Sequence, residues 1–252
     1  MITREPSSFK EYAEGKGINI SGEKLEDNKH PWKLSTKEAS EKLEIIAEIQ
    51  KAFKGYSGAV GKRLPNSIGA LIESSKVQIK RLKRDLVNLE KYSPLNEFEE
   101  LIKAVGEKYL ERAENSLKEA RGPYYIDCIY RSMRDNEISL GNVNPDNVYR
   151  REKLIIRDIE SCSYNLVECD AISFLSKAKR RKISLNYIEL IDSFCLWHDL
   201  ESESRVFIRA MVNYPYEFMR ACSRYRNIKK DWTADEYLEN LKEAIRKDGE
   251  VI

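Results

Sequence analysis

One segment of the chain concentrates residue types that could bind a metal ion. Residues 139–147 are rich in turn-forming residues and end at Asn147, and the short apolar run 153–157 is followed by Asp158 and Glu160. Two carboxylates and an amide oxygen are ligands that suit Mg²⁺. The same three side chains can instead fix the turn-rich loop to the strand after it. We expect this structural role, because Mg²⁺ usually needs substrate phosphates to complete its coordination.

Three further segments carry residue types that bind phosphate in other proteins. Residues 55–62 hold glycines and a lysine, but their spacing matches neither common phosphate-binding motif, so we interpret them as an interhelical loop. The basic clusters at residues 80–84 and 177–182 could contact the phosphates of a nucleic acid or an anionic substrate. We expect them to be solvated helix surfaces and expect no nucleic-acid partner, because the formal net charge is only +2.

The composition is that of a soluble globular protein. The 252 residues suffice for a substantial core, and the 41% hydrophobic fraction is too high for a disordered chain. No apolar run approaches the roughly 20 residues of a membrane-spanning helix, and the amino terminus lacks the apolar segment of a signal peptide. Five scattered cysteines and two histidines make a structural zinc site improbable. These features predict a cytoplasmic protein with reduced thiols and no membrane association.

The spacing of apolar residues predicts a mostly α-helical fold. Ser35 and Glu38 have the spacing of a capping box, and apolar residues at steps of three and four follow them on one helical face. Residues 153–157 indicate a strand of one small β-hairpin. Residues 1–33 predict an extended or irregular arm, with a candidate strand at 18–20, before a helical domain at 34–252. Two long helices with Leu86 and Val105 in the core come next, and further helices are expected near 124–134, 169–180, 184–196, 202–212, 215–226 and 234–247.

Short motifs in the second half of the chain occur in a recognisable order. They are Arg131-Ser132-Met133, Gly141-Asn142-Val143-Asn144-Pro145-Asp146-Asn147, Ile159-Glu160-Ser161-Cys162-Ser163-Tyr164-Asn165-Leu166, Ile188-Glu189-Leu190-Ile191-Asp192-Ser193-Phe194, Asn213-Tyr214-Pro215-Tyr216-Glu217-Phe218, Tyr225 with Lys230 and Trp232, and Tyr237-Leu238-Glu239-Asn240-Leu241. In this order they resemble segments of spore coat proteins of the aminoglycoside-phosphotransferase and choline-kinase-like superfamily. The likeness covers roughly residues 33–247 and implies the helical C-terminal lobe of a kinase-like fold.

The resemblance implies a role for each polar residue of the loop. Such kinases carry His-Gly-Asp-x-x-x-x-Asn, whose Asp accepts the proton of the substrate hydroxyl and whose Asn helps to hold the metal ion. Here Asn142 stands at the position of that base and Asn147 at that of the metal-binding Asn, while Asp158 matches the later metal-binding Asp and Glu160 the second acidic position. An amide cannot accept a proton at physiological pH, so the catalytic loop is degenerate.

A second departure from these kinases lies at the amino terminus. An N-terminal lobe that covers the nucleotide takes on the order of 80–100 residues, because it needs several strands of five or six residues with their turns. Only about 33 residues precede the first helix of the predicted lobe, and Lys10, Lys16 and Lys24 have no strand pattern around them. We therefore expect the N-terminal β lobe to be absent and nucleotide binding in the usual mode to be lost.

These observations predict a non-catalytic, pseudokinase-like binding or structural protein. We expect a protein partner, as in a coat or another complex, and no cofactor; the resemblance implies a place in the spore coat. An enzymatic alternative stays open: an atypical small-molecule transferase, or one subunit of it, would use the cleft around Asn142, Asn147 and Asp158 on a phosphorylated or cationic molecule. A further alternative is that another chain supplies the missing lobe.

Overall fold

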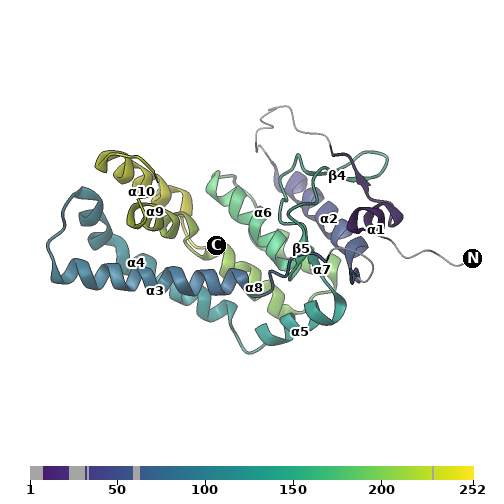
Figure 1. The fold of residues 1–252 in the computed structure, drawn as a ribbon, viewed down its shortest axis with the longest axis horizontal. Helices are drawn as coiled ribbons and strands as arrows, with labels where there is room; N and C mark the ends of the chain where they lie inside the picture. The colour runs from purple at the N-terminus through teal and green to yellow at the C-terminus, as the bar shows by residue number, and fades with distance from the viewer. Residues whose placement is uncertain (1–7, 23–31, 33, 59–62, 229) are drawn as a thin grey trace, which may run out of the picture.

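The computed structural model describes residues 8–22, 32, 34–58, 63–228 and 230–252. These residues form ten α-helices and two small β-sheets, which confirms the mostly α-helical fold (Figure 1). No helix among them is long and apolar enough to cross a membrane. The helices are α1 (Phe9–Gly15), α2 (Thr36–Phe53), α3 (Ala70–Lys91), α4 (Glu97–Ala120), α5 (Tyr125–Asp135), α6 (Glu168–Arg180), α7 (Tyr187–His198), α8 (Ser202–Asn213), α9 (Tyr216–Arg226) and α10 (Ala234–Asp248).

Helix α2 begins where the sequence predicts. The Ser35 hydroxyl accepts a hydrogen bond from the Glu38 amide at 3.2 Å, and the Glu38 carboxylate accepts one from the Ser35 amide at 2.7 Å. This capping box satisfies two amides that the first turn would leave without partners. The predicted apolar face of α2 packs toward α6 and α7. Its members are all buried: Ala39, Leu43, Ile46, Ile49 and Phe53.

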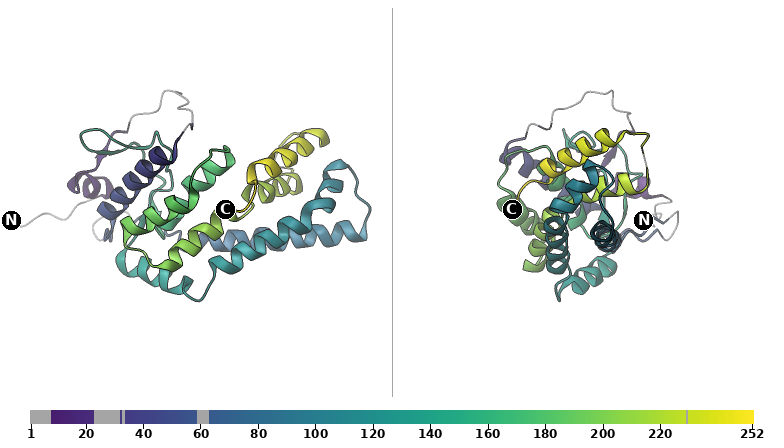
Figure 2. Two further views of the ribbon diagram at one scale, coloured as in Figure 1. Left: turned by 180° about the vertical axis from the view of Figure 1, so that it is seen from behind. Right: turned by 90° about the vertical axis from the view of Figure 1, so that its left-hand side faces the viewer.

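Helices α3 and α4 form a long hairpin that projects from the rest of the molecule. Figures 1 and 2 show this hairpin extending away from α2 and α7, with α9 and α10 packed along it. The contact is aromatic: the Tyr109 and Phe218 rings stack with centroids 4.1 Å apart, and those of Phe98 and Tyr225 at 4.0 Å. The aromatic residues of the C-terminal segment thus hold the last two helices on the hairpin.

Two small sheets lie at the other end of the molecule. Strands β3 (Val148–Arg150) and β4 (Leu154–Ile156) form the predicted hairpin, and β1 (Asn19–Ile20) adds a parallel strand beside β4. Strands β2 (Ile138–Ser139) and β5 (Ser163–Tyr164) pair antiparallel in a second sheet, which the sequence did not predict because two-residue strands carry too little alternation. This second sheet brings together the two ends of the segment that holds the loop of residues 139–147.

The expectation of an extended or irregular arm at residues 1–33 is wrong for the part that the structure describes. The Ser8 hydroxyl caps α1, which buries Phe9 and Ala13, and the Phe9 ring meets the Phe53 ring of α2 at 4.9 Å. Strand β1 follows, at the candidate strand position. A seven-residue helix shows hardly two turns of periodicity and is marginal alone, so its packing on α2, not its own sequence, stabilises it.

The predicted interhelical loop at residues 55–62 is described only as far as residue 58. Gly55 follows the end of α2 with φ +89°, a conformation that glycine adopts easily. Its amide donates to the Asp135 carbonyl at 3.1 Å, so the chain crosses from α2 to the end of α5. Residues 59–62 lie outside the described residues, as does Lys24.

The core confirms one of the two hairpin positions and corrects the other. Leu86 is 5% exposed, whereas Val105 is only half-buried and packs against the core without being part of it. The two helices of the hairpin approach closely at Gly106, where an added Cβ would lie 2.5 Å from Cδ2 of Leu86. All five cysteines are unpaired and four of them are buried, as their scattered spacing predicts.

The contact between Leu86 and Gly106 predicts a coupling that unfolding experiments can measure. Leu86→Ala should lower the free energy of unfolding by about 2–5 kcal/mol and Val105→Ala by less, because only the first leaves a buried cavity. Gly106→Ala gains up to about 1 kcal/mol of helix propensity but overlaps Leu86 in the wild type. In urea unfolding, Gly106→Ala should therefore raise the free energy of unfolding more in the Leu86→Ala background than in the wild type. An equal effect in both backgrounds would contradict the contact.

Candidate functional site

The side chain of Asn147 connects the loop of residues 139–147 to the end of β4. Its Nδ2 donates to the carbonyl of Asn142 at 2.7 Å and to that of Asp158 at 3.3 Å. Its Oδ1 accepts from the Asp158 amide at 3.0 Å. Asn147 is 2% exposed, so its amide is committed to the backbone on both sides. This arrangement supports the structural role that the sequence analysis preferred for Asn147.

The two carboxylates of the predicted Mg²⁺ set differ in their surroundings. Asp158 is half-buried, and its Oδ1 accepts from the Glu160 amide at 2.7 Å, while the Glu160 side chain is exposed. The described residues hold no group of three or more His, Cys, Asp or Glu side chains that could bind a metal ion. The structure thus brings Asn147 and Asp158 together but joins Glu160 to them through its backbone. Metal binding stays a prediction.

Asn142 lies in a turn whose shape depends on the residue before it. Gly141 has φ +69°, and an added Cβ would lie 2.4 Å from the carbonyl oxygen of Ser161. The Asn142 Oδ1 accepts from the Asn144 amide at 3.3 Å, a local bond that stabilises the turn. An Asp at position 142 could accept the same bond, so the turn itself does not demand an amide there.

A buried carboxylate that the sequence analysis missed binds the start of the loop. Asp170, in the first turn of α6, is 1% exposed. It accepts from the amides of Leu140 and Gly141 at 2.5 and 3.0 Å and from Gln50 Nε2 at 2.7 Å. Burial raises the pKa of Asp170 to about 6, although these hydrogen bonds oppose the shift. In the sequence, the one feature that could have indicated this role of Asp170 is its place next to the apolar face of a predicted helix.

Gln50 continues this polar chain from α2 to α7. Its Oε1 lies 2.9 Å from Nε2 of His198, the last residue of α7. Because the Gln50 amide nitrogen donates to Asp170, its oxygen must accept, so the His198 ring donates from Nε2. Burial lowers the pKa of His198 to about 3, which keeps the ring neutral at physiological pH. The sequence had offered no role for His198; the structure gives it a structural one.

Two lysines flank the same loop from opposite elements. Lys42 of α2 donates to the Pro145 carbonyl at 3.4 Å, and Lys177 of α6 donates to Asn144 Oδ1 at 3.2 Å. Burial lowers the pKa of both ammonium groups, and the nearby Asp146 carboxylate opposes this shift in each case. Two half-buried cations that hydrogen-bond neutral oxygens make the surroundings of residues 144–146 favourable for an anion.

The basic clusters therefore differ from each other. In residues 80–84 every charged side chain is exposed, which confirms a solvated surface. In residues 177–182, by contrast, Lys177 and Lys179 are half-buried, and Lys179 donates to Asn213 Oδ1 at 3.3 Å. The expectation of a wholly solvated surface is wrong for this second cluster, because α6 lies between the loop and α8.

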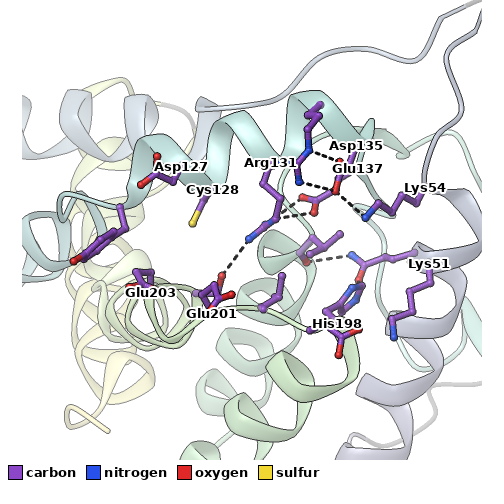
Figure 3. Close-up of a pocket in the computed structure, with 17 residues that line it drawn as sticks. Lys51, Lys54, Asp127, Cys128, Arg131, Asp135, Glu137, His198, Glu201 and Glu203 are labelled. Atoms are coloured by element: carbon purple, nitrogen blue, oxygen red, sulfur yellow. Dashed lines mark hydrogen bonds and ion pairs between the residues drawn. The ribbon is translucent and has the colours of Figure 1, made fainter.

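A cavity of about 790 Å³ lies on the side of Gln50 and His198 away from the loop. Elements α2, α5 and the start of α8 surround it, and Figure 3 shows Asp127 and Glu203 at one end with Lys51 and His198 at the other. The sequence analysis did not identify this cavity, because its walls come from segments far apart in the chain.

The floor of the cavity is a buried ionic cluster. Arg131 of α5 donates to Glu137 at 2.8 Å and to both carboxylate oxygens of Glu168 at 2.8 and 2.9 Å. The Ser204 hydroxyl donates to Glu168 at 2.6 Å. Burial raises the pKa of Glu137, and the Arg131 guanidinium opposes that shift. Loss of one partner would leave a buried charge unpaired, so the cluster fixes α5 against α6 and α8.

Comparisons with known proteins relate this geometry to one fold. No family model and no curated protein matches the chain. A crystal structure of an aminoglycoside phosphotransferase from Alicyclobacillus acidocaldarius subsp. acidocaldarius DSM 446 is similar to it at a TM-score of 0.68 and 12% sequence identity. The similarity covers 91% of this chain and 66% of that one. The chain therefore has part of the aminoglycoside-phosphotransferase fold.

The buried His198 predicts a specific dependence of stability on pH. Because its folded pKa is about 3 and its ordinary value 6.5, stability should fall as the pH drops below 6.5, where only the unfolded chain takes up this proton. His198→Gln keeps a donor for Gln50 and cannot titrate. Between pH 7 and 4.5 the wild type should lose roughly 2 kcal/mol more stability than the variant in urea unfolding.

Both proteins share Asp170, whose raised pKa acts in the opposite direction, so its contribution cancels in the comparison. Equal acid losses in the two proteins would show that His198 is not held neutral.

Proposed function

We propose that this protein is a non-catalytic, pseudokinase-like protein that acts by binding rather than by phosphoryl transfer. The observation that carries the proposal is the loop: Asn142 stands at the position of the base, and both ends of the Asn147 amide are bonded to backbone groups. Loss of a positioned base typically costs about 10²–10⁴-fold in rate. A loop held in shape without its base is suited to a structural or binding role.

The described residues also lack the strands that would cover a nucleotide. Their strands are two or three residues long, and β1 is paired with β4 rather than in a lobe of its own. Among the described residues, only one side of the space beside residues 141–147 is walled for a nucleotide. We propose that the protein works without a bound nucleotide and without Mg²⁺.

We propose a protein partner, in a coat or another complex, as the natural target of such a binding domain. The resemblance to spore coat proteins supports a place in the cytoplasm during assembly and afterwards in the coat. Neither a membrane nor a nucleic acid is part of this proposal, since the formal charges nearly balance at +2.

A second candidate is favoured by the two lysines beside the loop. If the cleft around Asn142, Asn147 and Asp158 does act on a small molecule, Lys42 and Lys177 favour a phosphorylated substrate over a cationic one. An atypical transferase would then need another source for the base and for the nucleotide-binding lobe.

The lack of nucleotide binding can be tested by thermal unfolding. A ligand at 100 times its Kd stabilises the folded state by about 2.7 kcal/mol, which raises the melting temperature by several degrees. We expect no shift with millimolar ATP and Mg²⁺. A clear shift would contradict the first candidate, and a shift with inorganic phosphate alone would point to the lysines rather than to a nucleotide site.

Two substitutions of Asn142 test whether the cleft is used in catalysis. Asn142→Asp and Asn142→Ala should both fold with melting temperatures close to the wild type, because Asp can accept the same bond from the Asn144 amide and Ala loses only that one local bond. Neither should consume ATP in a coupled assay. If Asn142→Asp gains phosphate release or transfer while Asn142→Ala does not, the cleft is in use and the second candidate replaces the first.

A further inference from the structure

Helix α5 exposes three large apolar side chains on one face. Ile126 is 51% exposed, Tyr130 66% and Met133 57%. Their spacing of four and three residues places them in a row along the helix, which we call the α5 stripe. Single exposed apolar residues are common, but three in a row on one helix indicate a surface that another helix covers.

Two opposite charges border the same side of the stripe. Asp127 and Arg134 both line the edge of the 790 Å³ cavity, and both are exposed. Asp127 lies three residues before Tyr130, and Arg134 lies four residues after it. Within the part of the chain that the structure describes, Asp127 has no ion-pair partner, and Arg134 pairs only with its neighbour Asp135. The stripe thus has a negative end and a positive end.

We propose that the α5 stripe pairs with the α5 stripe of a second copy of this chain, antiparallel about a twofold axis at Tyr130. In this arrangement Ile126 faces Met133 of the second copy, and the two Tyr130 rings meet at the axis. Asp127 then faces Arg134 of the second copy, on the same side of the stripe. The symmetry forms each contact twice, as in an isologous interface.

The charge pattern selects this orientation and this occupant. In a parallel pair Asp127 would face Asp127 and Arg134 would face Arg134, and like charges at such close range repel. The antiparallel pair replaces both repulsions with ion pairs and keeps the apolar residues opposite one another. A second copy therefore supplies both the apolar and the ionic complement of the stripe. Tyrosine at its centre is a residue type enriched in interfaces.

The interface should be modest in strength. Two eleven-residue helices bury less surface than a standard-size interface, so the dimer should form with a Kd in the micromolar range or weaker. The inference goes beyond the proposed function and does not depend on it, because the stripe lies outside the loop. A dimer would form whether or not the cleft binds a nucleotide.

Sedimentation velocity over about 10–500 µM protein tests the pairing at the concentrations expected for such a Kd. The wild type should shift from monomer toward dimer as the concentration rises. Tyr130→Lys should stay monomeric, with association weakened at least tenfold. Leu196→Lys is the matched control, because Leu196 is 67% exposed on α7 and lies outside the stripe. It should dimerise like the wild type. A wild type that stays monomeric throughout, or a Tyr130→Lys variant that still dimerises, would overturn the proposal.

Charge reversal tests the antiparallel register separately. Asp127→Arg alone should be monomeric, because the new guanidinium would face that of Arg134 in the second copy, and Arg134→Asp alone should be monomeric for the converse reason. In a homodimer of either variant, all four facing side chains at positions 127 and 134 would carry the same charge. An equimolar mixture of the two variants should form a heterodimer, because opposite charges then face each other. In that heterodimer one copy carries arginine at both positions and the other carries aspartate at both, so each ion pair unites the two charges. Thermal unfolding checks that each exposed substitution leaves the fold intact. A mixture that stays monomeric would overturn the register, and single variants that dimerise would overturn the ionic pairing.

Discussion

The buried carboxylate of Asp170 holds three parts of the molecule together. It accepts hydrogen bonds from the Leu140 and Gly141 amides of the loop and from Gln50 of α2, while its own backbone belongs to α6. A carboxylate out of contact with water is stable only when its oxygens are satisfied, so these partners cannot move independently. The loop, α2 and α6 therefore share one set of buried hydrogen bonds, which extends through Gln50 to His198.

Glu168, two residues earlier, extends this anchoring to the opposite side of α6. It is fully buried and binds Arg131 and Ser204, so the first turn of α6 fixes the loop on one side and α5 with α8 on the other. The helix has no side-chain cap, and these two carboxylates lie where the helix dipole favours negative charge. The 790 Å³ cavity is thus separate from the loop, and Gln50 of α2 contacts both the cavity and the residues that hold the loop.

This division shows that the loop keeps its shape without a carboxylate at position 142. The shape of the loop depends on backbone amides, on Gly141 and on Asn147, and none of these contacts uses a proton acceptor at position 142. Part of the aminoglycoside-phosphotransferase fold is therefore compatible with a binding role. Helix α5 adds the proposed means of association, since its inner side carries Arg131 and its outer side carries the stripe centred on Tyr130.

The sequence by itself determined the features that local rules govern. The capping box of α2, the helical faces and the β3–β4 hairpin follow from the spacing of a few residues, and the structure confirms them. The burial of Asp170, the cavity floor at Arg131 and the packing of α1 on α2 were decided by tertiary structure alone. Each depends on at least one contact between groups far apart in the chain, such as Gln50 with Asp170 or Ser204 with Glu168. No local pattern records such a pairing, because a carboxylate near the start of a helix has the same sequence signature whether it meets water or a buried amide.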